Sequence, residues 1–191
     1  PKRQSGVKAQ IKYLLNELYD VLHGIYLVKE ISPKTRDFIL SFGERLSASI
    51  IAEAFKEVQI DARFADSRQL IVTDRHFGNA SVHFEETDKR IQNFFISAQG
   101  ELQIFPGFIG STTEQETTTL GRGGSDYTGS ILAAALKVDV LEIWTDVNGM
   151  MTSDPKKVKN AFSIPEISYE EAMELSYFGA KVIYPPSIQP A

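Results

Sequence analysis

The feature that most constrains this chain is the glycine-rich turn Gly121-Arg122-Gly123-Gly124-Ser125-Asp126, which leads into an Ala- and Leu-rich helical segment at 127–137 and an apolar, strand-like segment at 138–144. Glycines let backbone N–H groups approach an anion, and a helix that starts there adds the positive end of its dipole. Arg122 adds a fixed charge that can hold a carboxylate or a phosphate through two parallel hydrogen bonds. The pattern predicts an anion site, with a tight turn and an Asp helix cap as the structural alternative.

Known glycine-rich motifs do not account for this turn. A Walker A loop requires Gly-Lys-Ser/Thr after four spacer residues, which the turn lacks. The dinucleotide fingerprint fails because Asp126 stands where its third glycine belongs. The His-Arg-Asp and Asp-Phe-Gly motifs of protein kinases are absent from the chain as well.

The rest of the chain alternates helical and strand-like patterns. Residues 6–58 predict helices, the first ending at Gly24, the second starting at Ser32-Pro33 and breaking at 41–43. Further signals indicate strands at 60–65, 70–72 and 102–105, a helix capped by Thr87, an exposed polar loop or hairpin at 110–119, and a capping box at 168–171 that starts a helix ending at Gly179. This alternation predicts an α/β fold with a mainly parallel sheet and helices on its faces.

Several other residues are candidates for chemistry, each with a plainer alternative. Thr145-Asp146 follows the strand-like segment directly, where parallel sheets collect ligands, although an Asx turn would use the same residues. Glu44 can recognise an amino group or simply favour a helix start. Lys181 can meet a nucleotide phosphate or offset a helix dipole, and the lysines of 156–159 can meet phosphates or form a solvated face. Trp144 is most simply a core residue.

Composition excludes several classes of function. The chain has 191 residues, no cysteine and a formal net charge of −5. Thiolate metal sites and cysteine nucleophiles are therefore excluded, and an acidic balance argues against nucleic acid or a membrane surface as a partner. The three histidines lack metal-ligand spacing, so we expect no protein-held metal. No apolar run reaches the length of a membrane span, and the first ten residues do not resemble a signal peptide, which is compatible with a cytoplasmic protein.

Taken together, the motifs resemble those of aspartate kinases, in the order that family shows. They are Ser41-Phe42-Gly43-Glu44-Arg45, Gly107-Phe108-Ile109-Gly110, the run 117–126 with the glycine-rich turn, Trp144-Thr145-Asp146-Val147 and the run 173–182. The stretches 22–25, 142–146 and 171–175 are most similar to the bifunctional aspartokinase–homoserine dehydrogenase type. The resemblance implies a three-layer αβα sandwich of the amino-acid-kinase type, cytoplasmic and homo-oligomeric in the intact protein.

The resemblance also implies an activity and roles for named residues. The activity is transfer of the ATP γ-phosphate to the β-carboxylate of L-aspartate, the first step to lysine, methionine and threonine, with Mg²⁺ bridging the phosphates. NADP would be a cofactor only if the protein also carries a dehydrogenase domain. The aspartate pocket would comprise Glu44, Phe108, Arg122, Gly123, Ser125 and Asp126, with Asp126 also organising catalytic lysines. ATP would lie along Thr145, Asp146, Met151, Lys156 and Lys181.

The chain departs from the family pattern in ways that set further expectations. The family opens with a strand bearing Lys-Phe-Gly-Gly-Thr-Ser, which does not occur here, so we expect residues 1–191 to be a partial kinase domain, inactive alone and prone to association. Met151, Lys156 and Tyr184 replace the frequent Tyr, Arg and His. Two alternatives stay open: a kinase for glutamate or N-acetylglutamate, and a non-catalytic ligand-binding module.

Overall fold

The computed structural model describes residues 2–98 and 100–177. Its helices are α1 (Lys2–Val28), α2 (Pro33–Glu57), α3 (Phe84–Ser97), α4 (Gly124–Leu136) and α5 (Tyr169–Tyr177), with a short 3₁₀ helix, η1, at Ser67–Gln69. Its strands are β1 (Ala62–Phe64), β2 (Leu102–Ile104), β3 (Ile109–Ser111) and β4 (Thr117–Thr119). The elements therefore alternate as an α/β fold requires.

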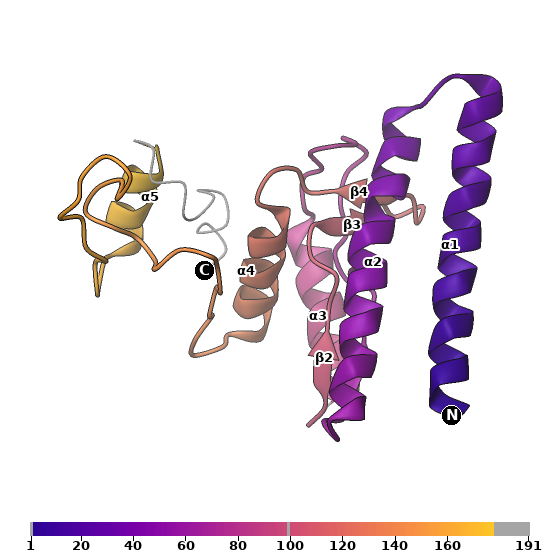
Figure 1. The fold of residues 1–191 in the computed structure, drawn as a ribbon, viewed down its shortest axis with the longest axis horizontal. Helices are drawn as coiled ribbons and strands as arrows, with labels where there is room; N and C mark the ends of the chain where they lie inside the picture. The colour runs from indigo at the N-terminus through magenta and orange to yellow at the C-terminus, as the bar shows by residue number, and fades with distance from the viewer. Residues whose placement is uncertain (1, 99, 178–191) are drawn as a thin grey trace.

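The strands form two short ladders that lie between layers of helices. β1 pairs in parallel with β2, with Ala62 opposite Leu102, and β3 pairs antiparallel with β4, with Ile109 opposite Thr119. Helix α2 packs on one face of these strands with α1 outside it, and α3 and α4 cover the other face (Figure 1). This is the three-layer arrangement that the family resemblance implies.

The described core lies between the strands and the pair α3 and α4. Its fully or nearly buried members are Leu70, Ile71, Ile91, Leu120, Ile131 and Ala135. Three phenylalanines border it, and the rings of Phe94 and Phe105 meet edge to face with centroids 5.8 Å apart. Burying such side chains stabilises the fold by about 1.5–3 kcal/mol each. The core holds the loops at the end of β4 and the start of α4 on a rigid base.

Both long helices continue through glycines at which the sequence pattern predicts a helix end or a helix break. Helix α1 runs past Gly24 to Val28, and α2 runs past Gly43 to Glu57. A glycine inside a helix costs only about 1 kcal/mol against alanine, and the packing of neighbouring turns offsets it. The start of α2 is as predicted, because the Ser32 hydroxyl caps the helix by accepting from the Thr35 N–H at 3.1 Å.

Thr87 does not cap a helix, contrary to the prediction. Helix α3 begins earlier, at Phe84, and Thr87 is fully buried in its first turns. Its hydroxyl accepts from the Val72 N–H at 3.0 Å, which ties α3 to a segment that forms single β-bridges instead of the predicted strand at 70–72. The capping box at 168–171 is confirmed, since Ser168 and Glu171 exchange hydrogen bonds between side chain and backbone at 3.0 and 3.2 Å.

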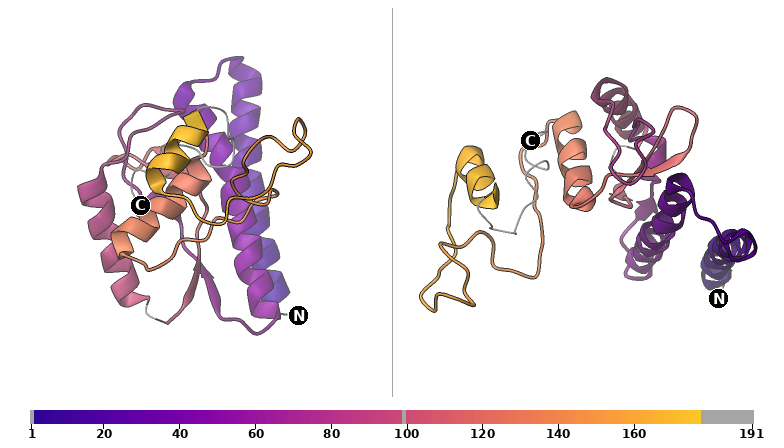
Figure 2. Two further views of the ribbon diagram at one scale, coloured as in Figure 1. Left: turned by 90° about the vertical axis from the view of Figure 1, so that its left-hand side faces the viewer. Right: turned by 90° about the horizontal axis from the view of Figure 1, so that it is seen from above.

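The segments at 110–119 and 138–144 also differ from their predictions. The first is a hairpin, but Thr112, Thr117, Thr118 and Thr119 are buried, and only its tip at 113–115 is exposed. The second forms no strand, and Trp144 is 89% exposed instead of lying in the core. Figure 2 shows why: beyond α4 the chain leaves the main body, and α5 lies on the far side of α4 from α2. Among the described residues, no helix combines the length and the apolar character that crossing a membrane requires.

Candidate functional site

A hollow of about 340 Å³ lies where α2, the Phe108 loop and the glycine-rich turn meet. It is lined by Glu44, Phe108, Gly121, Arg122, Gly123, Gly124, Ser125 and Asp126. The structure thus brings together all six residues that the resemblance assigns to the amino-acid pocket. The sequence analysis did not single out Gly121 and Gly124 as lining residues, although their place in the glycine-rich motif was a signal for them.

The shape of the turn explains why glycines occur there. Gly123 takes a left-handed conformation, with φ of 67°, as the N-cap of α4. A Cβ on Gly124 would lie 2.8 Å from a ring carbon of Phe108, so the turn and Phe108 are in direct contact. The Phe108 N–H completes this contact by donating to the Gly124 carbonyl at 3.2 Å and to the Thr128 hydroxyl at 3.0 Å. The start of α4 is therefore fixed against the wall of the hollow.

Two of the three charged side chains that line the hollow, Glu44 and Arg122, have opposite signs. Glu44 is half-buried on α2, and burial raises the pKa of its carboxyl above the ordinary value. Arg122 is exposed and lines the same hollow. Within the described residues neither forms an ion pair. A small ligand with an ammonium group and a carboxylate would match both side chains.

The residues assigned to the nucleotide lie apart from this hollow. Thr145, Asp146 and Lys156 are exposed in the chain beyond α4, and the Thr145 hydroxyl donates to the Asp146 carboxylate at 3.2 Å. Met151 is half-buried and forms a β-bridge with Ser163. The lining of the Glu44–Arg122 hollow includes none of these four. Lys181 lies outside the described residues.

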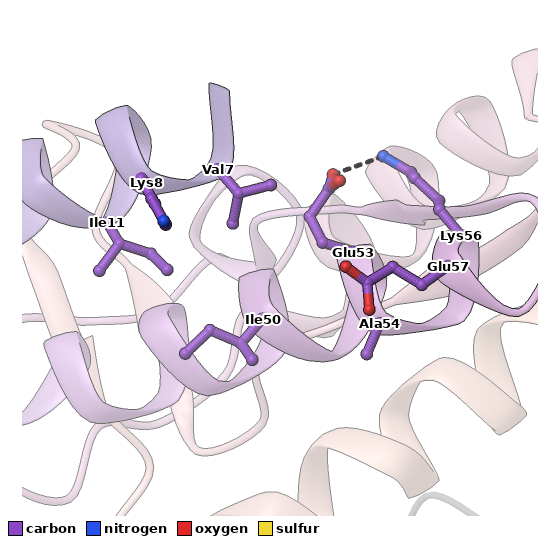
Figure 3. Close-up of a pocket in the computed structure, with 8 residues that line it drawn as sticks. All are labelled: Val7, Lys8, Ile11, Ile50, Glu53, Ala54, Lys56 and Glu57. Carbon is purple, nitrogen blue, oxygen red and sulfur yellow. Dashed lines mark hydrogen bonds and ion pairs between the residues drawn. The ribbon is translucent and has the colours of Figure 1, made fainter. Parts of the chain in front are cut away.

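A second hollow, between the start of α1 and the end of α2, has a different character (Figure 3). Val7, Ile11 and Ile50 give it apolar walls, and the ion pair of Glu53 with Lys56, 2.6 Å long, lies at its rim. No predicted site residue lines it. Across residues 2–98 and 100–177, no group of three or more His, Cys, Asp or Glu is placed to hold a metal ion.

Comparison with known proteins assigns the chain to a family. The amino acid kinase family matches residues 5–191. The bifunctional aspartokinase/homoserine dehydrogenase of Buchnera aphidicola is 40% identical over 181 residues, covering 94% of this chain and 22% of that protein. The lysine-sensitive aspartokinase 3 of Escherichia coli is 37% identical over 97% of this chain and 41% of its own length. The chain therefore spans about a fifth to two fifths of these relatives.

Solved structures agree with the sequence relatives. A crystal structure of E. coli aspartokinase III in complex with aspartate and ADP matches with a TM-score of 0.90 at 36% identity, over 97% of this chain and 41% of that one. The aspartate kinase of Clostridium acetobutylicum matches with a TM-score of 0.73 at 31% identity, over 94% of this chain and 36% of that one. The fold is thus one that these aspartokinases contain.

Proposed function

This chain belongs to the amino acid kinase family, and we propose that the protein carrying it transfers the γ-phosphate of ATP to the β-carboxylate of L-aspartate, giving 4-phospho-L-aspartate. The aspartokinase relatives support this activity, and the aspartokinase III complex with aspartate and ADP supports both substrate classes. Transfer to a carboxylate needs positioning and charge stabilisation rather than a covalent intermediate.

The observation that carries the proposal is the pair of unpartnered charges in one hollow. Glu44 accepts hydrogen bonds from the substrate ammonium, and Arg122 holds the α-carboxylate with two parallel hydrogen bonds. These two contacts fix both α-substituents, so the β-carboxylate is the group left free to react. The N-terminus of α4, which begins at Gly124, adds the positive end of the helix dipole on the carboxylate side.

The remaining residues of the hollow orient the reacting end of the substrate. Phe108 forms an apolar wall, and Ser125 is placed to donate to a substrate carboxylate. Asp126, in the first turn of α4, is close enough to line the hollow and organises the cationic groups that act on the phosphoryl group. Its role is positional, because a carboxylate would repel the transferring phosphate if it met it directly.

ATP binds along the chain beyond α4. The Thr145 hydroxyl donates a hydrogen bond to the nucleoside and the Asp146 carboxylate accepts one from it. Met151 packs against the nucleoside, and Lys156 and Lys181 contact the phosphates of ATP. Mg²⁺ enters with the nucleotide, because magnesium in kinases rests largely on phosphate oxygens, and when bound it neutralises their charge. NADP would be a cofactor only if the whole protein also carries a homoserine dehydrogenase domain.

A substrate panel with the whole protein tests the proposal. Phosphorylation should be ATP-dependent and should favour L-aspartate over glutamate and N-acetylglutamate, with the acyl phosphate trapped as a hydroxamate. N-Acetylation removes the positive charge that Glu44 recognises, so preference for N-acetylglutamate would contradict the assignment of Glu44. Absence of any acyl phosphate with all three substrates would instead favour a ligand-binding module.

A further inference from the structure

Asp37 is a buried carboxylate that the proposed reaction does not use. It lies near the start of α2 with none of its surface exposed. Within the described residues no lysine, arginine or histidine pairs with it. A carboxylate without a counterion is costly to bury, so it persists only where hydrogen bonds to it are well placed.

Three donors satisfy this carboxylate, and they come from two separate segments. Its Oδ2 accepts from the Gly78 N–H at 2.8 Å and from the Thr119 N–H at 2.9 Å. Its Oδ1 accepts from the Thr119 hydroxyl at 3.0 Å. Asp37 thereby joins α2 to the end of β4 and to the turn at 78–80 by charge-assisted hydrogen bonds.

Both of these segments support the glycine-rich turn. Thr119 is the last residue of β4, two positions before Gly121. The turn at 78–80 packs so closely against Gly121 that a Cβ on Gly121 would clash with the Asn79 Oδ1. The Ala80 N–H also donates to the Thr119 carbonyl at 2.9 Å, so turn and strand form one unit. The position of Arg122 therefore depends on the hydrogen bonds that fix the turn at 78–80 and the end of β4.

The other end of this connection leads to Glu44. Glu44 lies seven positions after Asp37 on the same helix, which is nearly two full turns and places both on one face of α2. Helix α2 is continuous from Pro33 to Glu57, so a shift of the turn that holds Asp37 also moves the turn that holds Glu44. The carboxylate of Asp37 thus connects α2, which carries Glu44, to the loop that carries Arg122.

We propose that Asp37 is a positioning residue that sets the separation between Glu44 and Arg122, and so the fit of the amino acid substrate. The inference rests on the proposed function, since it assigns those two side chains to one substrate. Asp37 touches neither the substrate nor the nucleotide. A substitution that moves the Asp37 carboxylate should therefore raise the KM for aspartate and leave the KM for ATP nearly unchanged.

Asp37→Glu in the whole protein tests this geometry while keeping the charge. The added methylene moves the carboxylate by about 1.5 Å in a site without free space, so α2 and β4 must shift relative to each other. We expect the KM for aspartate to rise at least about tenfold, with the KM for ATP within about twofold of wild type. Thr119→Val, which removes only the hydroxyl donor, should raise the aspartate KM about threefold or more, and it serves where Asp37→Glu does not fold.

Two further variants separate positioning from charge and from stability. In Asp37→Asn the amide oxygen can take the two N–H donors and the amide nitrogen can donate to the Thr119 hydroxyl, so the aspartate KM should stay within about threefold of wild type. Ser41→Ala is the matched control: Ser41 is also fully buried, one turn further along α2, and its hydroxyl donates to the Phe38 carbonyl at 2.6 Å, its one hydrogen bond among the described residues. Its kinetic constants should not change.

The outcomes distinguish this inference from the proposed function. Aspartate and ATP KM values that rise in parallel, or an unchanged aspartate KM in both Asp37→Glu and Thr119→Val, would overturn it. If the wild-type protein does not phosphorylate aspartate, the proposed function fails, and amide hydrogen exchange over 119–125 then decides the inference. Exchange there should be faster in Asp37→Glu and Thr119→Val than in Ser41→Ala. Equal exchange rates would refute the positioning role of Asp37.

Discussion

Arg122 combines an exposed guanidinium with a place in the lining of the hollow, which makes it the sharpest test among single residues. Arg122→Ala should raise the KM for aspartate about 30-fold or more, because a bidentate, charge-assisted contact of roughly 2–3 kcal/mol is lost. The KM for ATP should change by less than about threefold. Steady-state kinetics with each substrate varied in turn measures both effects.

Arg63 offers a matched control for that loss of charge. It is also an exposed arginine, on β1, and its guanidinium pairs with Glu101 at 2.8 Å away from the hollow. Arg63→Ala should leave both KM values unchanged. A similar rise of the aspartate KM in both variants would indicate a general effect of charge and would contradict the assignment of Arg122 to the aspartate site.

Glu44 should show opposite effects on stability and on binding. Burial raises the pKa of its carboxyl in the folded state above 4.5, so folding favours the protonated form. Its contribution to stability is therefore present below the unfolded pKa and is lost as the pH rises through the folded pKa. Glu44→Gln should be at least as stable as wild type at pH 7, with the difference vanishing toward about pH 4.5.

The same Glu44→Gln variant should bind aspartate poorly at neutral pH, because it removes the partner of the substrate ammonium. Urea unfolding from about pH 4.5 to about pH 7.5, alongside aspartate kinetics, measures both sides. Glu57→Gln, on the exposed end of α2, is the control and should change neither. A Glu44→Gln protein less stable than wild type at pH 7 would contradict the burial argument.

At the scale of elements, two glycines predict opposite responses to alanine. Gly24 lies inside α1, and a Cβ there would meet nothing within 4 Å, so Gly24→Ala should stabilise the helix by about 0.5–1 kcal/mol. Gly124→Ala should destabilise the protein by about 1–3 kcal/mol, because its Cβ would lie 2.8 Å from Phe108. Urea midpoints measured by circular dichroism check both signs, and a stabilised Gly124→Ala would refute the packing against Phe108.

These elements show where sequence patterns suffice. The cap at Ser32 and the capping box at 168–171 are local, since each bonds within a few residues of itself. The turn at 121–126 also has a local bond, from the Gly124 N–H to the Gly121 carbonyl at 3.1 Å. Their sequence signals were therefore enough to predict them. The six residues of the amino-acid pocket came from a motif resemblance, and the structure brings all of them into one hollow.

Other features depend on partners far along the chain, which local patterns cannot show. Thr118 and Thr119 of the hairpin are buried because distant groups satisfy their hydroxyls: Thr118 bonds Thr73 at 2.7 Å, and Thr119 bonds Asp37. Asp37 itself carried no signal, since an Asp in the first turns of a helix is ordinary. Gly24 and Gly43 predict helix ends that the structure does not have, because a glycine ends a helix only where the chain also turns away from the helix axis.

At the scale of the whole molecule, the segment 138–147 is the main departure from expectation. It has the apolar sequence of a buried strand, yet Val140 is 71% and Trp144 89% exposed. A strand forms only when a neighbour accepts its backbone hydrogen bonds, and within the described residues no strand lies beside it. Side chains selected for a sheet interior thus face solvent, which favours contact with another chain.

The 191-residue chain should therefore self-associate through this segment. Trp144 is the protein's one tryptophan, so its fluorescence reports on the segment alone: emission should shift to the blue, and acrylamide quenching should fall, as protein concentration rises. Light scattering should show a matching rise in mass, which Val140→Ser should reduce. Tyr13→Ser, at a side chain 68% exposed on α1, is the control and should leave association unchanged. A monomer with constant Trp144 emission at all concentrations would contradict the prediction.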